Sequence, residues 1–259
     1  MLRVFDSPAA IGEYLAEELL GRIERARAAG AHFLLGCPTG RSPRPLYDSL
    51  TRKIAAATQD ISHVILVMMD EYVTESGGGF QAAPSDAPWS CNHFTQAEMV
   101  ERWNGGLPGE KRIEQENVWF PDPQDPSAYD DKISDAGGID FFILASGASD
   151  GHVGFNPPGS PRQSRTRIIE LPESTRKDNL QTFPAFGSLA SVPTHGISVG
   201  IATIAAAKEA AMLLWGKGKA RSLARIVATS QYDPAWPATV IHECPQARIL
   251  SDADAATNQ

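Results

Sequence analysis

The sequence has little cysteine, no long apolar run and no basic cluster, and each absence excludes a class of protein. Its 259 residues include three cysteines, Cys37, Cys91 and Cys244, which are too few and too far apart for a disulfide framework or a zinc site. We therefore expect free thiols, a cytoplasmic location and no bound metal. No apolar stretch approaches the roughly 20 residues of a membrane helix, and the N-terminal residues do not resemble a signal peptide.

The charge of the chain restricts its partners. The net charge is -8 at pH 7, and no cluster of lysine and arginine stands out, so a nucleic-acid partner is not expected. An anionic small molecule remains possible, because a local pocket can be basic in an acidic protein. We predict a small-molecule ligand and neither a membrane nor a nucleic acid as partner.

Apolar segments that end at small residues alternate with helical patterns along the whole chain. The segments expected to be buried strands are residues 32–36, 64–69, 139–144, 196–200 and 212–215. This order predicts one domain over residues 1–259, an α/β fold with a doubly wound, mostly parallel sheet and helices on both faces. Within it we expect a flexible loop at 74–87, a possible lid at 172–186 and a frayed tail at 251–259.

A small, hydroxyl-containing turn follows the first inner strand and leads into a predicted helix at 44–57. The backbone amides at such a helix N-terminus favour a phosphate, and Thr39, Gly40, Arg41 and Ser42 could donate further hydrogen bonds. The turn matches neither the Walker nor the dinucleotide-binding motif. The alternative is an ordinary turn between a strand and a helix.

Two carboxylates, Asp70 and Glu71, come directly after a second apolar strand. A carboxylate in a largely apolar pocket is suited to removing a proton next to a carbonyl group. The alternative is a solvated acidic turn.

An acid and an imidazole, Asp150 and His152, follow the central apolar strand. The carboxyl ends of such strands are where open α/β sheets bind ligands. Lys219, in a glycine-rich turn after a later strand, is a second candidate for a phosphate contact. The alternatives are a simple turn at Asp150 and a solvated lysine.

Taken together, these motifs resemble the glucosamine-6-phosphate deaminase/isomerase family and its phosphogluconolactonase relatives. The segments that carry the resemblance are Pro38-Thr39-Gly40, Asp70-Glu71-Tyr72-Val73, Asp150-Gly151-His152-Val153-Gly154-Phe155-Asn156, Ser164-Arg165-Thr166-Arg167 and Gly216-Lys217-Gly218-Lys219. The second and third segments look like the deaminase branch, because the lactonases usually carry Asp-Glu-Arg at the second.

The resemblance implies an activity and a role for each candidate residue. The activity is ring opening of an amino-sugar 6-phosphate, isomerisation to the ketose and loss of ammonia, without a cofactor. Asp70 matches the base that moves a proton from carbon 2 to carbon 1, and Asp150 with His152 matches the ring-opening pair. The residues implied at the substrate and its phosphate are Thr39, Gly40, Arg41, Ser42, Glu71 and Lys219.

Three positions depart from the family pattern. Pro157 stands where a glutamate normally pairs with the ring-opening histidine, Gln181 where an arginine helps to hold the phosphate, and Ile169 where the regulated enzymes have a lysine. Glu71, Glu170 and Glu173 are the candidates to replace the missing carboxylate. A lactone hydrolase and a non-catalytic sugar-phosphate binder remain alternatives, as do the gluco and galacto substrates, and a homo-oligomer is possible.

Overall fold

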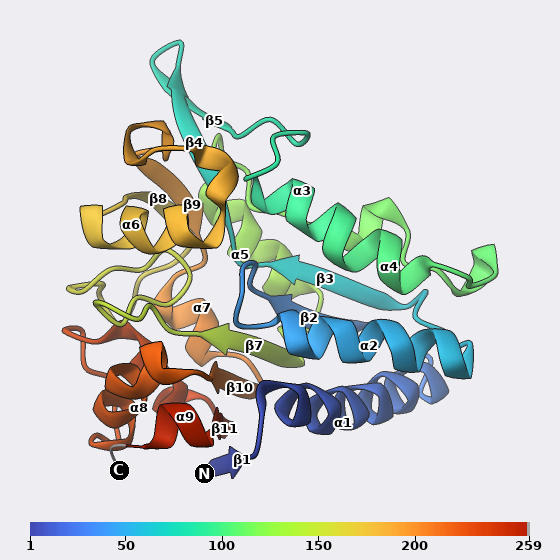
Figure 1. Cartoon of the computed structure of the whole chain (residues 1–259). Coiled ribbons are helices and arrows are strands. Elements are labelled where there is room, and N and C mark those ends of the chain that lie inside the picture. Colours follow the sequence, from blue (N-terminus) through green and yellow to red (C-terminus); the bar gives the residue numbers. More distant parts are fainter. Residues whose placement is uncertain (258–259) are drawn as a thin grey trace.

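The computed structural model, which describes residues 1–257, contains a seven-stranded parallel sheet (Figure 1). Across the sheet the strands are β1 (Leu2–Phe5), β11 (Gln246–Asp252), β10 (Glu209–Leu214), β7 (Phe141–Ala145), β2 (Phe33–Cys37), β3 (Val64–Met68) and β6 (Val118–Trp119). Every neighbouring pair is parallel. The predicted fold class is confirmed.

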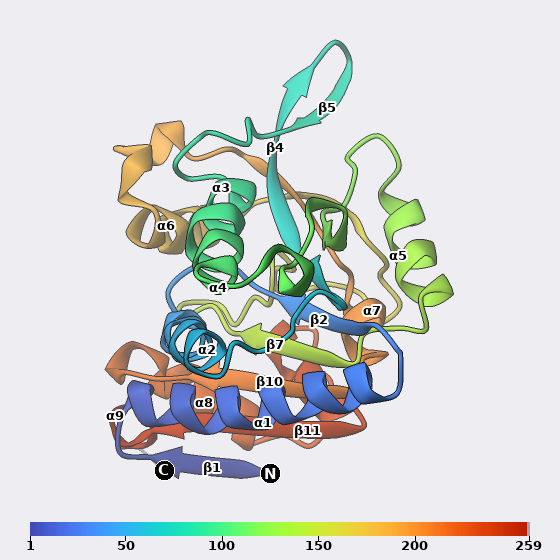
Figure 2. The same ribbon diagram turned by 90° about the vertical axis from the view of Figure 1, so that its right-hand side faces the viewer.

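Helices cover both faces of this sheet (Figure 2). The α-helices of the described residues are α1 (Pro8–Ala28), α2 (Arg44–Ala57), α3 (Cys91–Thr95), α4 (Glu101–Asn104), α5 (Pro126–Asp135), α6 (Glu173–Thr182), α7 (Ile201–Ala205), α8 (Ala220–Val227) and α9 (Ala253–Ala256), and not all of them lie on this sheet. Because side chains alternate along a strand, Phe141 and Ile143 of β7 enter one core and Phe142 and Leu144 enter the other. This double burial explains the continuous apolar runs in the sequence.

A second, antiparallel sheet was not predicted. Its strands, in order, are β5 (Gly79–Ala82), β4 (Asp70–Ser76), β9 (His195–Ser198) and β8 (Arg167–Glu170). Only Met69 separates β3 of the first sheet from β4 of the second. Asp70 therefore lies where the chain passes from one sheet to the other.

Two segments contain regular structure where a loop and a lid were expected. The segment 74–87, expected as a flexible loop, contains most of a β-hairpin of β4 and β5, which projects from the body of the protein (Figure 1), and its flexibility stays a prediction. Glycines at the tip suit a tight hairpin as well as a flexible loop, and the sequence does not distinguish them. The segment 172–186 contains α6, and its mobility stays a prediction.

The expected frayed tail at 251–259 was wrong over the part described. Ser251 and Asp252 are buried in β11, and α9 follows directly. Two of its residues, 258 and 259, lie outside the described residues. The three cysteines are free and buried, and none of the helices at residues 1–257 has the length and apolarity needed to cross a membrane.

Candidate active site

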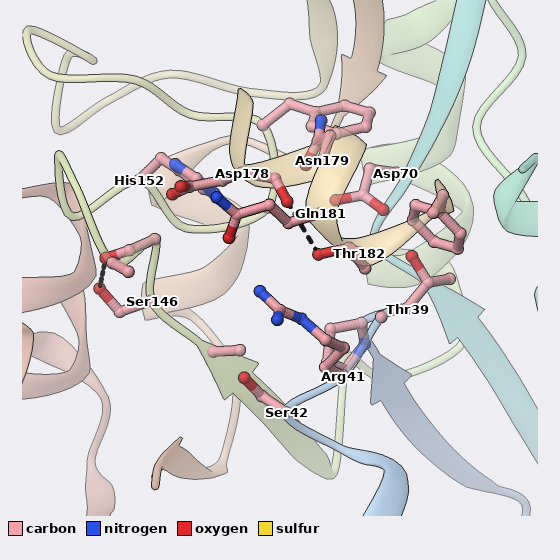
Figure 3. Close-up of a pocket in the computed structure, with 18 of the residues that line it drawn as sticks. Thr39, Arg41, Ser42, Asp70, Ser146, His152, Asp178, Asn179, Gln181 and Thr182 are labelled. Atoms are coloured by element: carbon pink, nitrogen blue, oxygen red, sulfur yellow. Dashed lines mark hydrogen bonds between the residues drawn. The ribbon is translucent and has the colours of Figure 1, made fainter. Parts of the chain in front are cut away.

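A cavity of about 360 Å³ opens at the carboxyl ends of the parallel strands (Figure 3). After β2 the chain continues to β3 on one side, whereas after β7 it continues to β10 on the other. The boundary between β2 and β7 is thus a topological switch point, where the diverging connections leave a crevice. The turns after these strands, 38–42 and 145–148, line the cavity.

The turn after β2 presents Arg41 and Ser42 to one side of the cavity (Figure 3). Gly40 has a φ of +92°, a conformation that L side chains rarely adopt. The turn is fixed by Tyr47, whose hydroxyl donates to the Pro38 carbonyl at 2.8 Å. The turn therefore brings the cation Arg41 to the cavity just before the N-terminus of α2, and the phosphate contact expected there stays a prediction.

Lys219 approaches the cavity from the turn after β10. Its ammonium donates to the carbonyl of Ser146, and burial lowers its pKa to about 8. The carboxylate of Asp252 accepts two hydrogen bonds from the amide of Gly216, at 2.9 and 3.1 Å, and so fixes the start of this turn. Asp252 had been assigned to the tail and was missed.

Asp70 is buried on the opposite side of the cavity from His152 (Figure 3). Its Oδ1 accepts a long hydrogen bond of 3.5 Å from the thiol of Cys91. Gly154, with a φ of +56°, leaves room for it, because a Cβ there would come within 3.3 Å of the carboxylate. Burial raises the pKa of Asp70 to about 7, against the thiol hydrogen bond. Such a carboxylate can accept a proton near neutral pH.

Glu71 does not line the cavity. Its carboxylate accepts backbone hydrogen bonds from Tyr72 at 2.8 Å, Cys91 at 3.0 Å and Asn92 at 2.7 Å. The last two donors belong to the N-terminus of α3, where unpaired amides favour an anion. The structure therefore gives Glu71 an anchoring contact with α3 and not the substrate contact that was predicted.

Asp150 and His152 form a hydrogen-bonded pair at the cavity wall. Nδ1 of His152 lies 2.7 Å from Oδ1 of Asp150, which also accepts from the backbone amide of His152 at 3.1 Å. Burial tends to raise the pKa of Asp150, but its bonds to His152 and Ser174 hold that pKa well below its usual range. Gly147 packs against the imidazole, since a Cβ there would lie 2.2 Å from Nδ1. The ring is thus oriented through Nδ1 at the cavity wall, and its Nε2 makes no hydrogen bond within residues 1–257.

Comparison with known proteins agrees with this geometry. Residues 6–250 match the family model described as glucosamine-6-phosphate isomerases/6-phosphogluconolactonase. The chain belongs to this family. The predicted family is therefore confirmed.

Several relatives in the family are named deaminases. The chain is 34% identical over 229 residues to a glucosamine-6-phosphate deaminase of Shouchella clausii, covering 86% of this chain and 84% of that protein. It is 36% identical over 247 residues to one of Pseudarthrobacter chlorophenolicus, with 93% and 84% covered.

Solved structures of the family share the fold. A monomeric glucosamine-6-phosphate deaminase superposes with a TM-score of 0.83 at 24% identity, covering 100% of this chain and 99% of that one. A 6-phosphogluconolactonase from Leishmania guyanensis gives 0.72 at 15% identity, with 100% and 98% covered.

Helix α6 adds cavity-lining residues, most of which sequence reasoning missed. Gln181, already named from the sequence, lines the cavity together with Asp178, Asn179 and Thr182, which were not (Figure 3). Ser174 and Thr175 donate to Oδ2 of Asp150, at 2.7 and 3.2 Å. The polar composition of 172–186 indicated a lid but not which face of the helix points inward.

None of the three glutamates considered as a new partner for His152 fills that place. Glu71 binds the amides of α3, Glu170 is exposed at the sheet edge, and Glu173 pairs with Lys177 at 2.6 Å on the surface. The carboxylate of α6 that lies close to the ring is Asp178. Those candidate assignments were wrong because the helix turns Glu173 outward and Asp178 inward.

The carboxylates around His152 could also be considered as metal ligands. Among residues 1–257, Asp150, His152 and Asp178 have potential ligand atoms within 4.8 Å of one another. The oxygens of Asp150, however, already accept hydrogen bonds from His152, Ser174 and Thr175. These bonds account for the arrangement as an acid–base pair.

Proposed function

We propose that this protein is a glucosamine-6-phosphate deaminase, which converts the amino-sugar phosphate to a ketose 6-phosphate and ammonia. The observation that carries the proposal is that Asp70 and His152, which pairs with Asp150, lie on opposite sides of one cavity (Figure 3), and that Arg41 and Lys219 also line it. A deaminating isomerase needs all three elements. The substrate named in the curated relatives supports the gluco compound.

The phosphate binds at the cationic side of the cavity. Arg41 and Lys219 supply positive charge, and the turn 39–42 supplies amides and hydroxyls next to α2. Charge-assisted hydrogen bonds of this kind fix a phosphate strongly. The sugar then extends toward Asp70 and His152.

The chemistry proceeds in three steps. His152, oriented by Asp150, donates a proton to the ring oxygen as the bond between carbon 1 and that oxygen breaks, and the anomeric hydroxyl loses its proton, which leaves an open-chain aldehyde. Asp70 removes the proton from carbon 2 and returns it to carbon 1, while the oxygen on carbon 1 takes up a proton released by the ammonium group, so that the amine becomes an iminium at carbon 2. Water adds to the iminium, and ammonia leaves as the ketone forms.

A lactone hydrolase is the second candidate, because the family includes 6-phosphogluconolactonases. Hydrolysis of a lactone requires an acid–base pair but no base at carbon 2. A buried Asp70 with its pKa raised to about 7 favours the deaminase.

A panel of substrates tests the proposal. We expect ammonia release from glucosamine 6-phosphate, slower release from galactosamine 6-phosphate, and little hydrolysis of 6-phosphogluconolactone. In deuterated water the ketose product should carry deuterium at carbon 1. Lactone hydrolysis without ammonia release would support the second candidate, and binding without either reaction would support a non-catalytic role.

A further inference from the structure

One face of α6 is directed at the Asp150–His152 pair. Ser174, Thr175 and Asp178 are spaced so that they share a helix face, with Asp178 one turn beyond the other two. Ser174 and Thr175 hold Oδ2 of Asp150, so this face is in contact with the pair. Asp178 consequently lies on the cavity wall beside His152 (Figure 3).

Asp150 and Asp178 differ in how much hydrogen-bonding capacity they retain. Asp150 accepts from the ring and amide of His152 and from the two hydroxyls of α6. Within residues 1–257, the side chain of Asp178 accepts a hydrogen bond from Ser149 Oγ at 3.0 Å and forms no ion pair. An ionised carboxylate offers about four acceptor positions, so Asp178 can accept further protons or hydrogen bonds from a ligand in the cavity.

The charge of Asp178 also fits its surroundings. Its electrostatic interaction with Lys219 favours the charged ammonium and outweighs the opposing effect of Arg41. Asp178 therefore influences Lys219, which is expected to hold the phosphate, and also lies near the imidazole expected to act on the sugar ring.

Opening a cyclic hemiacetal requires two proton transfers on neighbouring oxygens of one carbon. One proton must reach the ring oxygen, and another must leave the anomeric hydroxyl. A donor and an acceptor held a few ångströms apart can serve both oxygens at once. His152 and Asp178 have ligand atoms within 4.8 Å of each other.

We propose that Asp178 is a catalytic residue that accepts the proton of the anomeric hydroxyl while His152 protonates the ring oxygen. This inference rests on the proposed function. The electron pair of the hydroxyl O–H bond becomes the second bond of the carbonyl group. The electron pair of the broken bond between carbon 1 and the ring oxygen stays on the ring oxygen. The step leaves a neutral imidazole and a protonated Asp178, and return of that proton to His152 restores both groups.

The test isolates ring opening from deamination. In Asp70→Asn the reaction stops once the ring has opened, so exchange between the α and β anomers of glucosamine 6-phosphate reports this step alone. NMR exchange spectroscopy measures its rate. Adding Asp178→Asn should slow the protein-dependent exchange by about 100-fold or more. Glu173→Gln, an exposed carboxylate of the same helix, is the matched control and should have no effect.

Two further variants separate chemistry from structure. Asp178→Glu should restore part of the exchange rate, whereas Asp178→Ala should not, and all variants should bind the unreactive glucitol 6-phosphate with nearly unchanged affinity. Unchanged anomer exchange in Asp178→Asn would overturn the proposal, and so would loss of glucitol 6-phosphate binding in every Asp178 variant.

The same measurements distinguish a failure of the proposed deaminase function from a failure of the role proposed for Asp178. A protein that releases no ammonia but shows exchange dependent on Asp178 would refute the deaminase and retain this residue's role. Conversely, a wild-type protein that deaminates while Asp70→Asn gives no anomer exchange would refute the role of Asp178.

Discussion

Asp70 and Glu71 are adjacent in β4, yet their carboxylates contact different parts of the protein. Asp70 lines the cavity and has one long hydrogen bond from Cys91, whereas Glu71 accepts three backbone amides at and near the N-terminus of α3. Alternation along a strand directs neighbours to opposite sides. Glu71 thereby holds α3, and α3 places Cys91 against the proposed base.

The pKa of Asp70 predicts the acidic limb of the pH profile. Since the base must be ionised and burial raises its pKa to about 7, activity should be half-maximal near pH 7 and level off only about one pH unit or more above it. Deuterium exchange at carbon 1 of the ketose 6-phosphate, which has no amine, measures this limb. Cys91→Ala should move the limb to higher pH and Cys91→Ser to lower pH, because the donor at this position favours the carboxylate. If neither variant moves the acidic limb, the limb reports the ionisation of a group other than Asp70.

Lys219 predicts the alkaline limb of binding. Its ammonium is charged below a pKa of about 8, so affinity for a sugar phosphate should fall as the pH rises above that value. Lys219→Ala should weaken glucitol 6-phosphate about 10- to 100-fold at pH 7 and leave glucitol unaffected. Lys219→Arg should bind without the alkaline loss. Calorimetric titration measures each affinity.

The matched control for Lys219 lies in the same turn. Lys217 is exposed and does not line the cavity, so Lys217→Ala should bind as the wild type does. Equal losses in both lysine variants would indicate a general effect of charge and contradict a specific contact.

Glu71→Ala should reduce stability and spare binding. Loss of the three hydrogen bonds that it accepts, two from amides of α3 and one from the amide of Tyr72, should cost about 2–4 kcal/mol of the free energy of unfolding. Urea denaturation measures this change, and the affinity of the folded variant for glucitol 6-phosphate should stay within about threefold. A loss of affinity at unchanged stability would restore the substrate contact first predicted from the sequence.

How much of the site the sequence predicts depends on how far apart along the chain the interacting residues lie. Strand ends fix the places of Thr39, Asp70, Asp150, His152 and Lys219, because carboxyl ends of parallel strands share one edge. The second sheet and the inward face of α6 depend on pairing between distant segments, such as Asp70 with Ser198. Local patterns do not contain that information, so Asp178 and Asp252 were missed and Glu71 was misplaced.

Asp252 tests whether a distant anchor positions the phosphate-binding lysine. Its carboxylate fixes the amide of Gly216 at the start of the Lys219 turn and also caps α9 through the amide of Ala255 at 2.9 Å. Asp252→Ala should therefore cost about 1–2 kcal/mol of stability and also weaken glucitol 6-phosphate about tenfold.

The loss of a helix cap alone should not weaken ligand binding, and Asp125 provides the comparison. It caps α5 by accepting from the amide of Ala128 at 3.3 Å, and neither residue lines the cavity. Asp125→Ala should reduce the free energy of unfolding by a comparable amount and leave the affinity unchanged. If both variants lose affinity equally, the effect of Asp252 is general destabilisation. If only Asp252→Ala does, the last strand of the sheet determines where Lys219 meets the phosphate.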